Sequence, residues 1–249
     1  MKEISSDTPA LCEMRESQEQ VGRSKKDTTD VAQQKPQWQF NCCELPNLEG
    51  NQRLVAGVDE VGRGALFGPV VAAAVILPTS TLSKLAIAGI KDSKQLSGLQ
   101  RLKLAQEIKE LALDWRIGYA TSQEIDQFNI LQASLLAMKR GILKLNVKPD
   151  ICLVDGNYSL PNLPLPQQTM IKGDERSLEI AAASIVAKVW RDDLVMRLAT
   201  KYPNYDLVAN KGYGTQKHRL ALQQYGPSRL HRMSFSPCQI GLKVRRLEG

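Results

Sequence analysis

The stretch that most constrains the fold runs from residue 54 to residue 71, because it places two acidic residues between two apolar runs. The first run is rich in valine and ends at Asp59 and Glu60, and a Gly-Arg-Gly turn at residues 62–64 precedes the second. This pattern predicts two antiparallel strands joined by a turn. Ionised carboxylates on a core strand are unfavourable unless something pairs with them, and the flanking glycines let another backbone approach closely. We therefore predict a functional site here, in preference to a solvated strand end.

The rest of the chain alternates between apolar runs of strand length and segments with helical periodicity. The predicted elements are strands at residues 115–120, 151–154 and 168–172 and helices at residues 98–113, 129–145, 176–199 and 215–225. A short helical turn at residues 124–128 precedes Asn129, which we expect to cap the long helix. Interleaved strands and helices predict an α/β domain over residues 51–249, with a helical C-terminal segment.

Residues 1–50 differ from the rest, because they are rich in Ser, Thr, Gln, Lys and Glu and poor in large apolar residues. Such a segment buries too little surface to offset its ordering entropy, so we predict a disordered polar tail. The net charge of +7 is uneven: residues 1–52 carry six basic and nine acidic side chains, which leaves the remainder at +10. A domain that basic favours polyanions, with nucleic acid ahead of a membrane surface.

Several localisation signals are missing from the sequence. No apolar run approaches the roughly 20 residues that a bilayer-spanning helix needs. The N-terminus has no h-region of a signal peptide, and its acidic residues argue against a transit peptide. The five cysteines show no CxxC spacing, so neither a disulfide framework nor a zinc site is indicated. We expect a cytoplasmic protein without membrane attachment.

Two further acids follow the same placement as Asp59 and Glu60. Asp155 ends the strand at residues 151–154, and Asp174 lies between a strand and the most strongly patterned helix. Ligands of open α/β sheets gather where strands end, and carboxylates that converge there need a cation to neutralise them. Oxygen ligands without His or Cys indicate Mg²⁺ or Mn²⁺, and two such ions can drive phosphodiester hydrolysis. Strand neighbours point to opposite faces, so Glu60 needs a break in the strand, or must use its carbonyl, to reach the same site.

The motifs of the chain, in their order along it, resemble those of ribonuclease HII over about residues 53–240. They are residues 57–64 (GVDEVGRG), 68–71 (GPVV), 92–96 (DSKQL), 129–134 (NILQAS), 154–156 (VDG), 172–174 (KGD), 181–189 (AAASIVAKV) with Arg191 and Asp192, and 211–215 (KGYGT) with His218. The resemblance implies an RNase H-like fold, a mixed β-sheet flanked by helices, with a C-terminal helical extension that helps to grip a duplex.

The resemblance also implies an activity. A monomeric endonuclease of this family would hydrolyse the RNA strand of RNA–DNA hybrids and cut 5′ of single ribonucleotides embedded in duplex DNA. The expected products carry 5′-phosphate and 3′-hydroxyl ends, and the expected cofactors are Mn²⁺ or Mg²⁺. The residues that would act as metal-binding catalytic acids are Asp59, Glu60, Asp155 and Asp174.

Substrate recognition is implied for a second set of residues. The backbone of Gly62, Arg63 and Gly64 would read the 2′-hydroxyl, the group that distinguishes RNA from DNA. Tyr213 would stack on the sugar of the following deoxynucleotide. The residues that would touch phosphates are Lys94, Ser184 and Lys188, for which a solvated helix position is an equally good interpretation.

Other polar residues near these motifs have plainer interpretations. We expect Arg191 and Asp192 to form local ion pairs or caps. His218 and His231 are more often structural or phosphate-facing than catalytic in such a context. Asp126 and Asp150 are interpreted as helix-end or turn acids.

The chain departs from the usual motif at Ala65, where a proline is common, and at Phe67, where a small residue is usual. Trp190 replaces a small or polar residue, and we expect it to pack rather than to touch substrate. Two other functional classes share this fold: a non-catalytic hybrid-binding module, and a DNA nuclease or strand-transfer enzyme. The complete set of four acids argues against the first, and the Gly-Arg-Gly turn with Tyr213 argues against the second.

Overall fold

The computed structural model describes residues 53–90 and 96–239, and these surround a five-stranded sheet in the order β3-β2-β1-β4-β5. The strands are β1 (Val55–Val61), β2 (Val70–Ile76), β3 (Asp114–Ala120), β4 (Ile151–Asp155) and β5 (Gln167–Met170). β2 is antiparallel to both β1 and β3, whereas β4 is parallel to both β1 and β5. The sheet is therefore mixed, as the sequence predicts.

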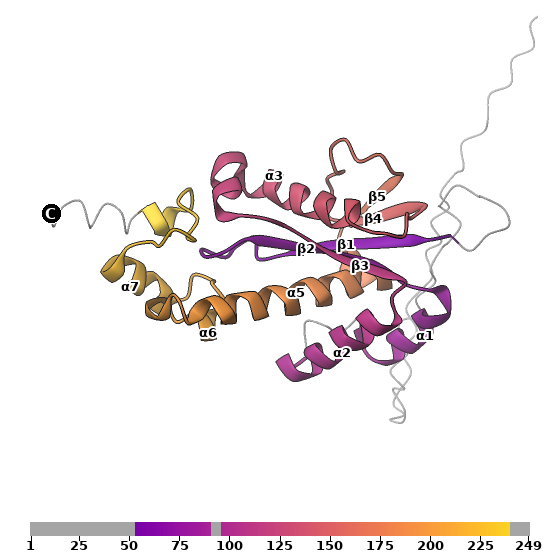
Figure 1. Ribbon diagram of the computed structural model, residues 1–249, viewed down its shortest axis with the longest axis horizontal. Helices are drawn as coiled ribbons and strands as arrows, with labels where there is room; N and C mark the ends of the chain where they lie inside the picture. Colours follow the sequence, from indigo (N-terminus) through magenta and orange to yellow (C-terminus); the bar gives the residue numbers. More distant parts are fainter. Residues whose placement is uncertain (1–52, 91–95, 240–249) are drawn as a thin grey trace, which may run out of the picture. The chain divides into compact units, whose positions relative to one another are not determined.

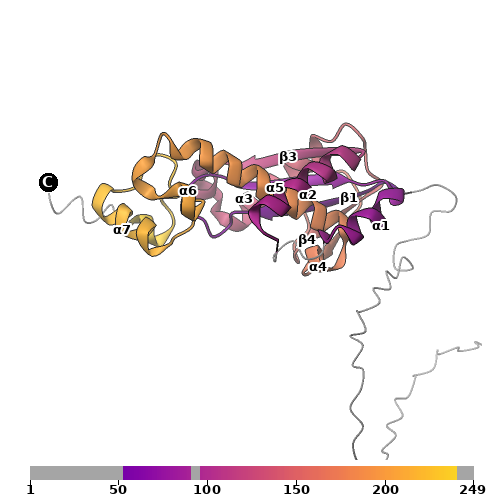
Figure 2. The ribbon, with the colours of Figure 1, turned by 90° about the horizontal axis from the view of Figure 1, so that it is seen from below.

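Helices cover both faces of the sheet (Figure 1). One face packs on α3 (Ser122–Leu143), and the other packs on α5 (Leu178–Ala199), with α1 (Thr79–Ile87) and α2 (Gly98–Leu111) on the same side. The remaining helices are short: α4 (Gly173–Arg176), η3 (Pro203–Tyr205), α6 (Leu207–Asn210) and α7 (Gln216–Tyr225). Figures 1 and 2 show α6 and α7 beyond one end of the sheet, and we call residues 200–239 the C-terminal module.

Small residues let the two helical layers approach the sheet closely. All seven residues of β2 are buried, because α3 packs on one face of this strand and α5 on the other. A Cβ atom on Gly57 of β1 would overlap the backbone of Glu179 in α5. One on Gly118 of β3 would overlap the carbonyl oxygen of Ala137 in α3. These glycines are therefore required by packing.

The helix at residues 122–143 contains the cap that the sequence predicts at Asn129. Thr121 caps the first turns, together with Glu124, in a capping box. At Asn129 the backbone leaves the helical region, with φ 69° and ψ 166°, and its side-chain oxygen accepts a hydrogen bond from the Gln132 amide at 3.1 Å. The short helical turn and the long helix thus meet at a kink in α3. Helix α5 starts at Leu178 rather than Arg176, because Ser177 caps it.

None of the helices in the described parts of the chain is long and apolar enough to cross a membrane. The tail predicted for residues 1–50 lies outside the described residues, and so does Lys94, one of the predicted phosphate contacts.

Candidate active site

Strand register brings two of the predicted catalytic acids together. β1 and β4 run parallel, with Val58 paired to Val154, so the next step of the same register sets Asp59 beside Asp155. Residues that face each other on neighbouring strands share a face of the sheet. That face is the one covered by α5, because the Ser184 hydroxyl of α5 hydrogen bonds with the Asp59 carboxylate. Asp59 is buried, with 6% of its surface exposed.

The surroundings of Asp59 disfavour its negative charge. Burial raises the pKa of Asp59 well above its usual range, and the charges of Glu60 and Asp155 raise it further. The Ser184 hydroxyl and the Glu60 amide, which donates to Oδ1 at 2.7 Å, act in the opposite direction. A buried carboxylate beside two others is a place where a cation would relieve repulsion.

Glu60 lies on the same strand as Asp59, and the strand continues past it without a break. Regular pairing with β2 continues through Glu60 to Val61, so the strand break considered from the sequence does not occur within β1. The Glu60 side chain is 8% exposed, and its carboxylate pairs with the Arg63 guanidinium at 3.2 Å. Burial raises the pKa of Glu60, Arg63 opposes that shift, and the charge of Asp155 adds to it. Glu60 is therefore within electrostatic reach of Asp155.

Asp174 lies on α4, just after the sheet. Lys172 adopts a left-handed conformation with φ 53°, which turns the chain from β5 into this short helix. The Gly173 amide then donates a hydrogen bond to the Asp155 Oδ1 at 2.7 Å. This bond ties the residue before Asp174 to the carboxylate that ends β4.

The fit of these residues to a metal ion rests on the chemistry of the donors. Within residues 53–90 and 96–239, no three Asp, Glu, His or Cys side chains are already grouped as a metal cage. Hard oxygen donors are nevertheless what Mg²⁺ and Mn²⁺ prefer, and the charges of Glu60 and Asp155 add to burial in raising the pKa of Asp59. The structure thus brings Asp59 and Asp155 together, with Glu60 next to Asp59 on β1 and Asp174 on the short helix α4.

The Gly-Arg-Gly turn is joined directly to the C-terminal module. Isolated β-bridges pair Ala65 with Tyr213 and Phe67 with His231. The Leu66 amide donates to the Gly212 carbonyl at 2.8 Å. Ala65 and Phe67, the two departures from the usual motif, are both fully buried in this junction. The predicted ribose-reading turn and the predicted stacking residue are therefore neighbours, although about 150 residues separate them in sequence.

Two buried arginines, which sequence reasoning did not identify as functional, hold this junction. Arg191 of α5 donates to the carbonyl oxygens of Phe67, Pro69 and Lys211 at 3.0, 3.2 and 2.9 Å. Arg232 donates to the carbonyl oxygens of Gly68 and Arg63 at 3.0 and 2.7 Å. The predicted local ion pair of Arg191 is therefore wrong.

The sequence does not distinguish these buried arginines from surface ones. Arg197 lies on the same helix as Arg191, yet it is exposed and pairs with Asp193. The part of the prediction that concerned Asp192 is confirmed, because Asp192 pairs with Lys188 of the same helix at 2.9 Å.

The two glycines of the turn have different requirements. Gly62 has φ +88°, and a Cβ atom there would overlap the Arg191 guanidinium, so packing alone demands glycine. Gly64 has no heavy atom within 4 Å of an added Cβ, and its φ lies outside the left-handed range. Its side of the turn is open, which leaves room for another molecule to approach the backbone.

Lys188 and Trp190 of α5 make contacts within the protein. Lys188 forms an ion pair with Asp192, and Trp190 stacks on Tyr119 with ring centroids 6.5 Å apart, which is the packing role that we expected.

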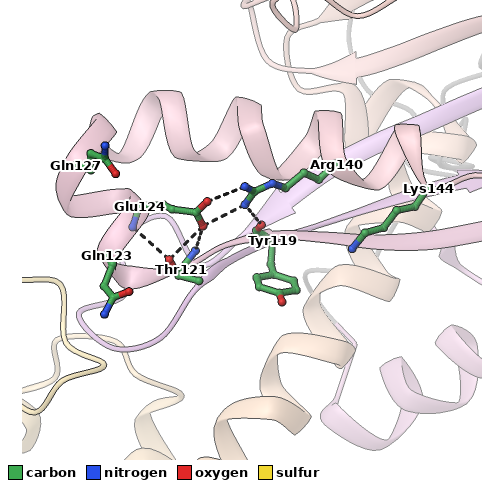
Figure 3. Close-up of a pocket in the computed structure, with 7 residues that line it drawn as sticks. All are labelled: Tyr119, Thr121, Gln123, Glu124, Gln127, Arg140 and Lys144. Atoms are coloured by element: carbon green, nitrogen blue, oxygen red, sulfur yellow. Dashed lines mark hydrogen bonds and ion pairs between the residues drawn. The ribbon is translucent and has the colours of Figure 1, made fainter.

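Tyr119 also borders an open hollow of about 570 Å³ beside β3 (Figure 3). The hollow is lined by Tyr119, Thr121, Gln123, Glu124, Gln127, Arg140 and Lys144. No predicted site residue is among them.

The sequence model of the family described as Ribonuclease HII matches residues 56–238. The chain belongs to the ribonuclease HII family. A protein named Ribonuclease HII from Trichormus variabilis is 64% identical over 205 residues, which are 82% of this chain and 90% of the relative. A protein of that name from Acaryochloris marina is 59% identical over 188 residues, 76% of this chain and 95% of the relative.

The crystal structure of ribonuclease H2 from Pyrococcus horikoshii has a TM-score of 0.67 and 27% identity, covering 77% of this chain and 99% of that one. The RNase H-like fold is thereby confirmed. Membership of the ribonuclease HII family makes the protein a ribonuclease H, a divalent-metal-dependent endonuclease that acts on nucleic acid.

Proposed function

We propose that this ribonuclease HII cleaves the RNA strand of RNA–DNA hybrids and also cuts 5′ of a single ribonucleotide embedded in duplex DNA, acting as a monomer. The observation that carries this proposal is the pairing of Ala65 with Tyr213. It joins the turn that follows Glu60 to the aromatic residue predicted to stack on a sugar. Hydrolytic acids, a ribose-reading turn and an aromatic platform would then contact consecutive nucleotides of one strand.

The acids that would hold metal ions are Asp59, Glu60, Asp155 and Asp174. Bound Mg²⁺ or Mn²⁺ would supply an activated water and would stabilise the charge that develops on the scissile phosphate. Ser184 would fix the orientation of Asp59 through the hydrogen bond between them. Arg63 would do the same for Glu60, and its side chain is 52% exposed, so it could also face a phosphate.

Discrimination of ribose would depend on the backbone of the turn. Gly64 offers an approach free of side chains, and the Arg63 carbonyl is fixed by Arg232 at 2.7 Å, so the turn is rigid on one side and open on the other. A rigid polar backbone can recognise a 2′-hydroxyl as donor and acceptor. Tyr213 is half-buried and lies 5.4 Å from the Arg191 guanidinium, which stiffens the platform for the next sugar.

The test is cleavage of a labelled DNA duplex that contains one ribonucleotide, with Mg²⁺ or Mn²⁺ present. We expect a cut on the 5′ side of the ribonucleotide that leaves a 5′-phosphate, and we expect EDTA or Asp59→Asn to abolish it. A matched control is Asp150→Asn. The Asp150 carboxylate accepts a hydrogen bond from the Leu54 amide, which lies at the end of β1 away from Asp59. Equal cutting of an all-DNA duplex would overturn the proposal, and so would full activity of Asp59→Asn.

Tyr213 is tested with two substrates. Tyr213→Ala should reduce cutting at the single ribonucleotide more than it reduces cutting of a continuous RNA–DNA hybrid, where the sugar that follows the recognised ribose is also a ribose. Unchanged kinetics at the single ribonucleotide would remove the stacking role.

A further inference from the structure

Two histidines lie in contact beneath Tyr213, in a part of the C-terminal module that the proposed chemistry does not use. The Nε2 atoms of His218 and His231 are 3.0 Å apart, and both residues are almost completely buried. His218 Nδ1 lies 2.9 Å from the carbonyl oxygen of Tyr213. His231 Nδ1 lies 2.9 Å from the backbone amide of Ser228. The pair therefore forms one chain of hydrogen bonds that ends at the Tyr213 backbone.

Both ends of this chain fix where its protons lie. The Ser228 amide can only donate, so His231 Nδ1 must accept, and a neutral His231 carries its proton on Nε2. The Tyr213 carbonyl can only accept, so His218 must carry its proton on Nδ1. His218 Nε2 is then the acceptor that His231 Nε2–H requires. A single pair of neutral tautomers satisfies all three contacts.

The surroundings keep both rings neutral and hold them in place. Burial and, to a smaller extent, the neighbouring His218 lower the pKa of His231 to about 3. Burial also lowers the pKa of His218. The Tyr205 ring packs against both histidines, and the Phe67 ring packs edge-on against His231. Phe67 belongs to the segment after the Gly-Arg-Gly turn. The histidine pair therefore contacts both this segment and Tyr213, the two elements predicted to recognise the sugars.

We propose that His218 and His231 are positioning residues that set the height and tilt of Tyr213 relative to the Gly-Arg-Gly turn, and thereby set the preference for an RNA–DNA junction. The Tyr213 loop needs such support because Lys211 and Gly212 both have left-handed backbones, with φ 50° and 84°, and no regular strand or helix contains Tyr213. This inference rests on the proposed role of Tyr213 in stacking on the following sugar. The inference predicts that losing the hydrogen bond from His218 to the Tyr213 carbonyl changes the preference for the single-ribonucleotide duplex over a continuous hybrid.

Three variants separate positioning from stability. His218→Leu removes the donor to the Tyr213 carbonyl, whereas His218→Asn keeps a donor at the position of Nδ1 and removes only the acceptor for His231. Tyr205→Phe is the control, because it deletes a buried hydrogen bond of the same module, from the Tyr205 hydroxyl to the Gly226 carbonyl at 2.8 Å, and leaves the histidine chain intact.

The measured quantity is kcat/KM on the single-ribonucleotide duplex divided by kcat/KM on a continuous RNA–DNA hybrid. We expect His218→Leu to lower this ratio about tenfold, since small misplacements of a positioning group change rates by such factors. His218→Asn should restore most of the ratio, and Tyr205→Phe should not change it. A ratio unchanged in His218→Leu, or one that falls equally in Tyr205→Phe, would overturn the positioning role.

A double variant and a spectrum complete the test. In a Tyr213→Ala background, His218→Leu should leave the ratio where Tyr213→Ala alone puts it, whereas an additional tenfold drop would contradict action through Tyr213. Two-bond ¹H–¹⁵N spectra at neutral pH should show His231 as the Nε2–H tautomer and His218 as the Nδ1–H tautomer. Any other pair of tautomers, or a protonated ring, would overturn the inference. If Tyr213→Ala itself leaves the ratio unchanged, the proposed stacking fails instead, and the spectrum still decides the structure of the pair.

Discussion

Asp59 and Asp155 lie where strand register puts them, whereas Tyr213 lies where a few buried polar side chains put it. The acids sit at facing positions of two parallel strands, and the spacing of the ladder is fixed by backbone hydrogen bonds. Tyr213 sits in an irregular loop, joined to the rest by an isolated bridge, by Arg191 and by His218. One region is built from repeated local geometry, and the other from single contacts between distant segments.

The difference concerns how each region can fail. Removing one side chain from a strand leaves its ladder in place, so the acids are displaced only when the backbone itself is forced apart. Removing a buried arginine leaves several carbonyl oxygens without a partner at once, and each unsatisfied group is unfavourable by about 1–3 kcal/mol. The catalytic end of the sheet should therefore tolerate side-chain changes that the junction with the C-terminal module does not.

The strongest way to break the sheet region is Gly57→Ala. The new Cβ would overlap the Glu179 backbone, so β1 and α5 must separate, and with them Asp59 and Ser184. We expect a loss of roughly 4 kcal/mol or more in the free energy of unfolding, measured by urea denaturation, together with loss of cleavage. Gly98→Ala is the control, because an added Cβ there meets nothing within 4 Å, and it should stabilise by about 0.5–1 kcal/mol. Equal stability of the two variants would show that close strand–helix contact does not explain Gly57.

The junction is broken most directly by Arg191→Met. The variant leaves the carbonyls of Phe67, Pro69 and Lys211 without their donor. We expect a loss of about 3 kcal/mol in the free energy of unfolding. Arg197→Met on the same helix should change it by less than about 0.5 kcal/mol, because that side chain is 65% exposed. If the two variants unfold at the same urea concentration, the junction does not depend on the buried guanidinium.

The same contrast explains how much the sequence alone could predict. The strands, the main helices and the Asn129 cap follow from local patterns, and the acids follow from their places at strand ends. In the sequence Arg191 looks like any other polar residue of its helix, and its burial depends on the approach of distant segments that include Gly62. His218 and His231 gain their roles from each other, although 13 residues separate the end of α7 that holds His218 from the loop that holds His231. Contacts between single distant side chains have no period, so a pattern cannot predict them.

The histidine pair predicts a pH dependence that the sheet region does not share. Well above pH 6.5, His231 is neutral in both folded and unfolded states and contributes no pH dependence. As the pH falls from 6.5 towards about 3, the unfolded state takes up a proton that burial denies to the folded state, so stability decreases. The loss between pH 7 and pH 5 should be about 2 kcal/mol. Urea denaturation of the wild type and of His231→Gln at both pH values isolates this contribution, since glutamine does not titrate. Parallel losses in the two proteins would contradict it.

The smallest effect is expected at a polar contact that lies outside both regions, beside β3. Glu124 receives two hydrogen bonds from Arg140, which lower the pKa of Glu124 to about 2 (Figure 3). A lowered carboxyl pKa stabilises the fold above the usual carboxyl range and loses that contribution as the pH falls towards about 2. The Arg140 side chain is 38% exposed, and solvent screens the pair, so Glu124→Gln should remove only about 0.5–1 kcal/mol at pH 7.

Salt distinguishes this contact from the buried junction. Because the Glu124–Arg140 pair is partly exposed, its contribution should shrink in about 1 M salt, where charges are screened beyond roughly 3 Å. The effect of Arg191→Met should persist in the same salt, since its partners are neutral carbonyls in a buried site. Urea denaturation of both variants at low and high salt makes the comparison, with Asp193→Asn as an exposed control. If Glu124→Gln destabilised the protein as much as Arg191→Met at both salt concentrations, the Glu124–Arg140 contact beside β3 would behave like the buried junction. The junction would then not be unusual in depending on single side-chain contacts.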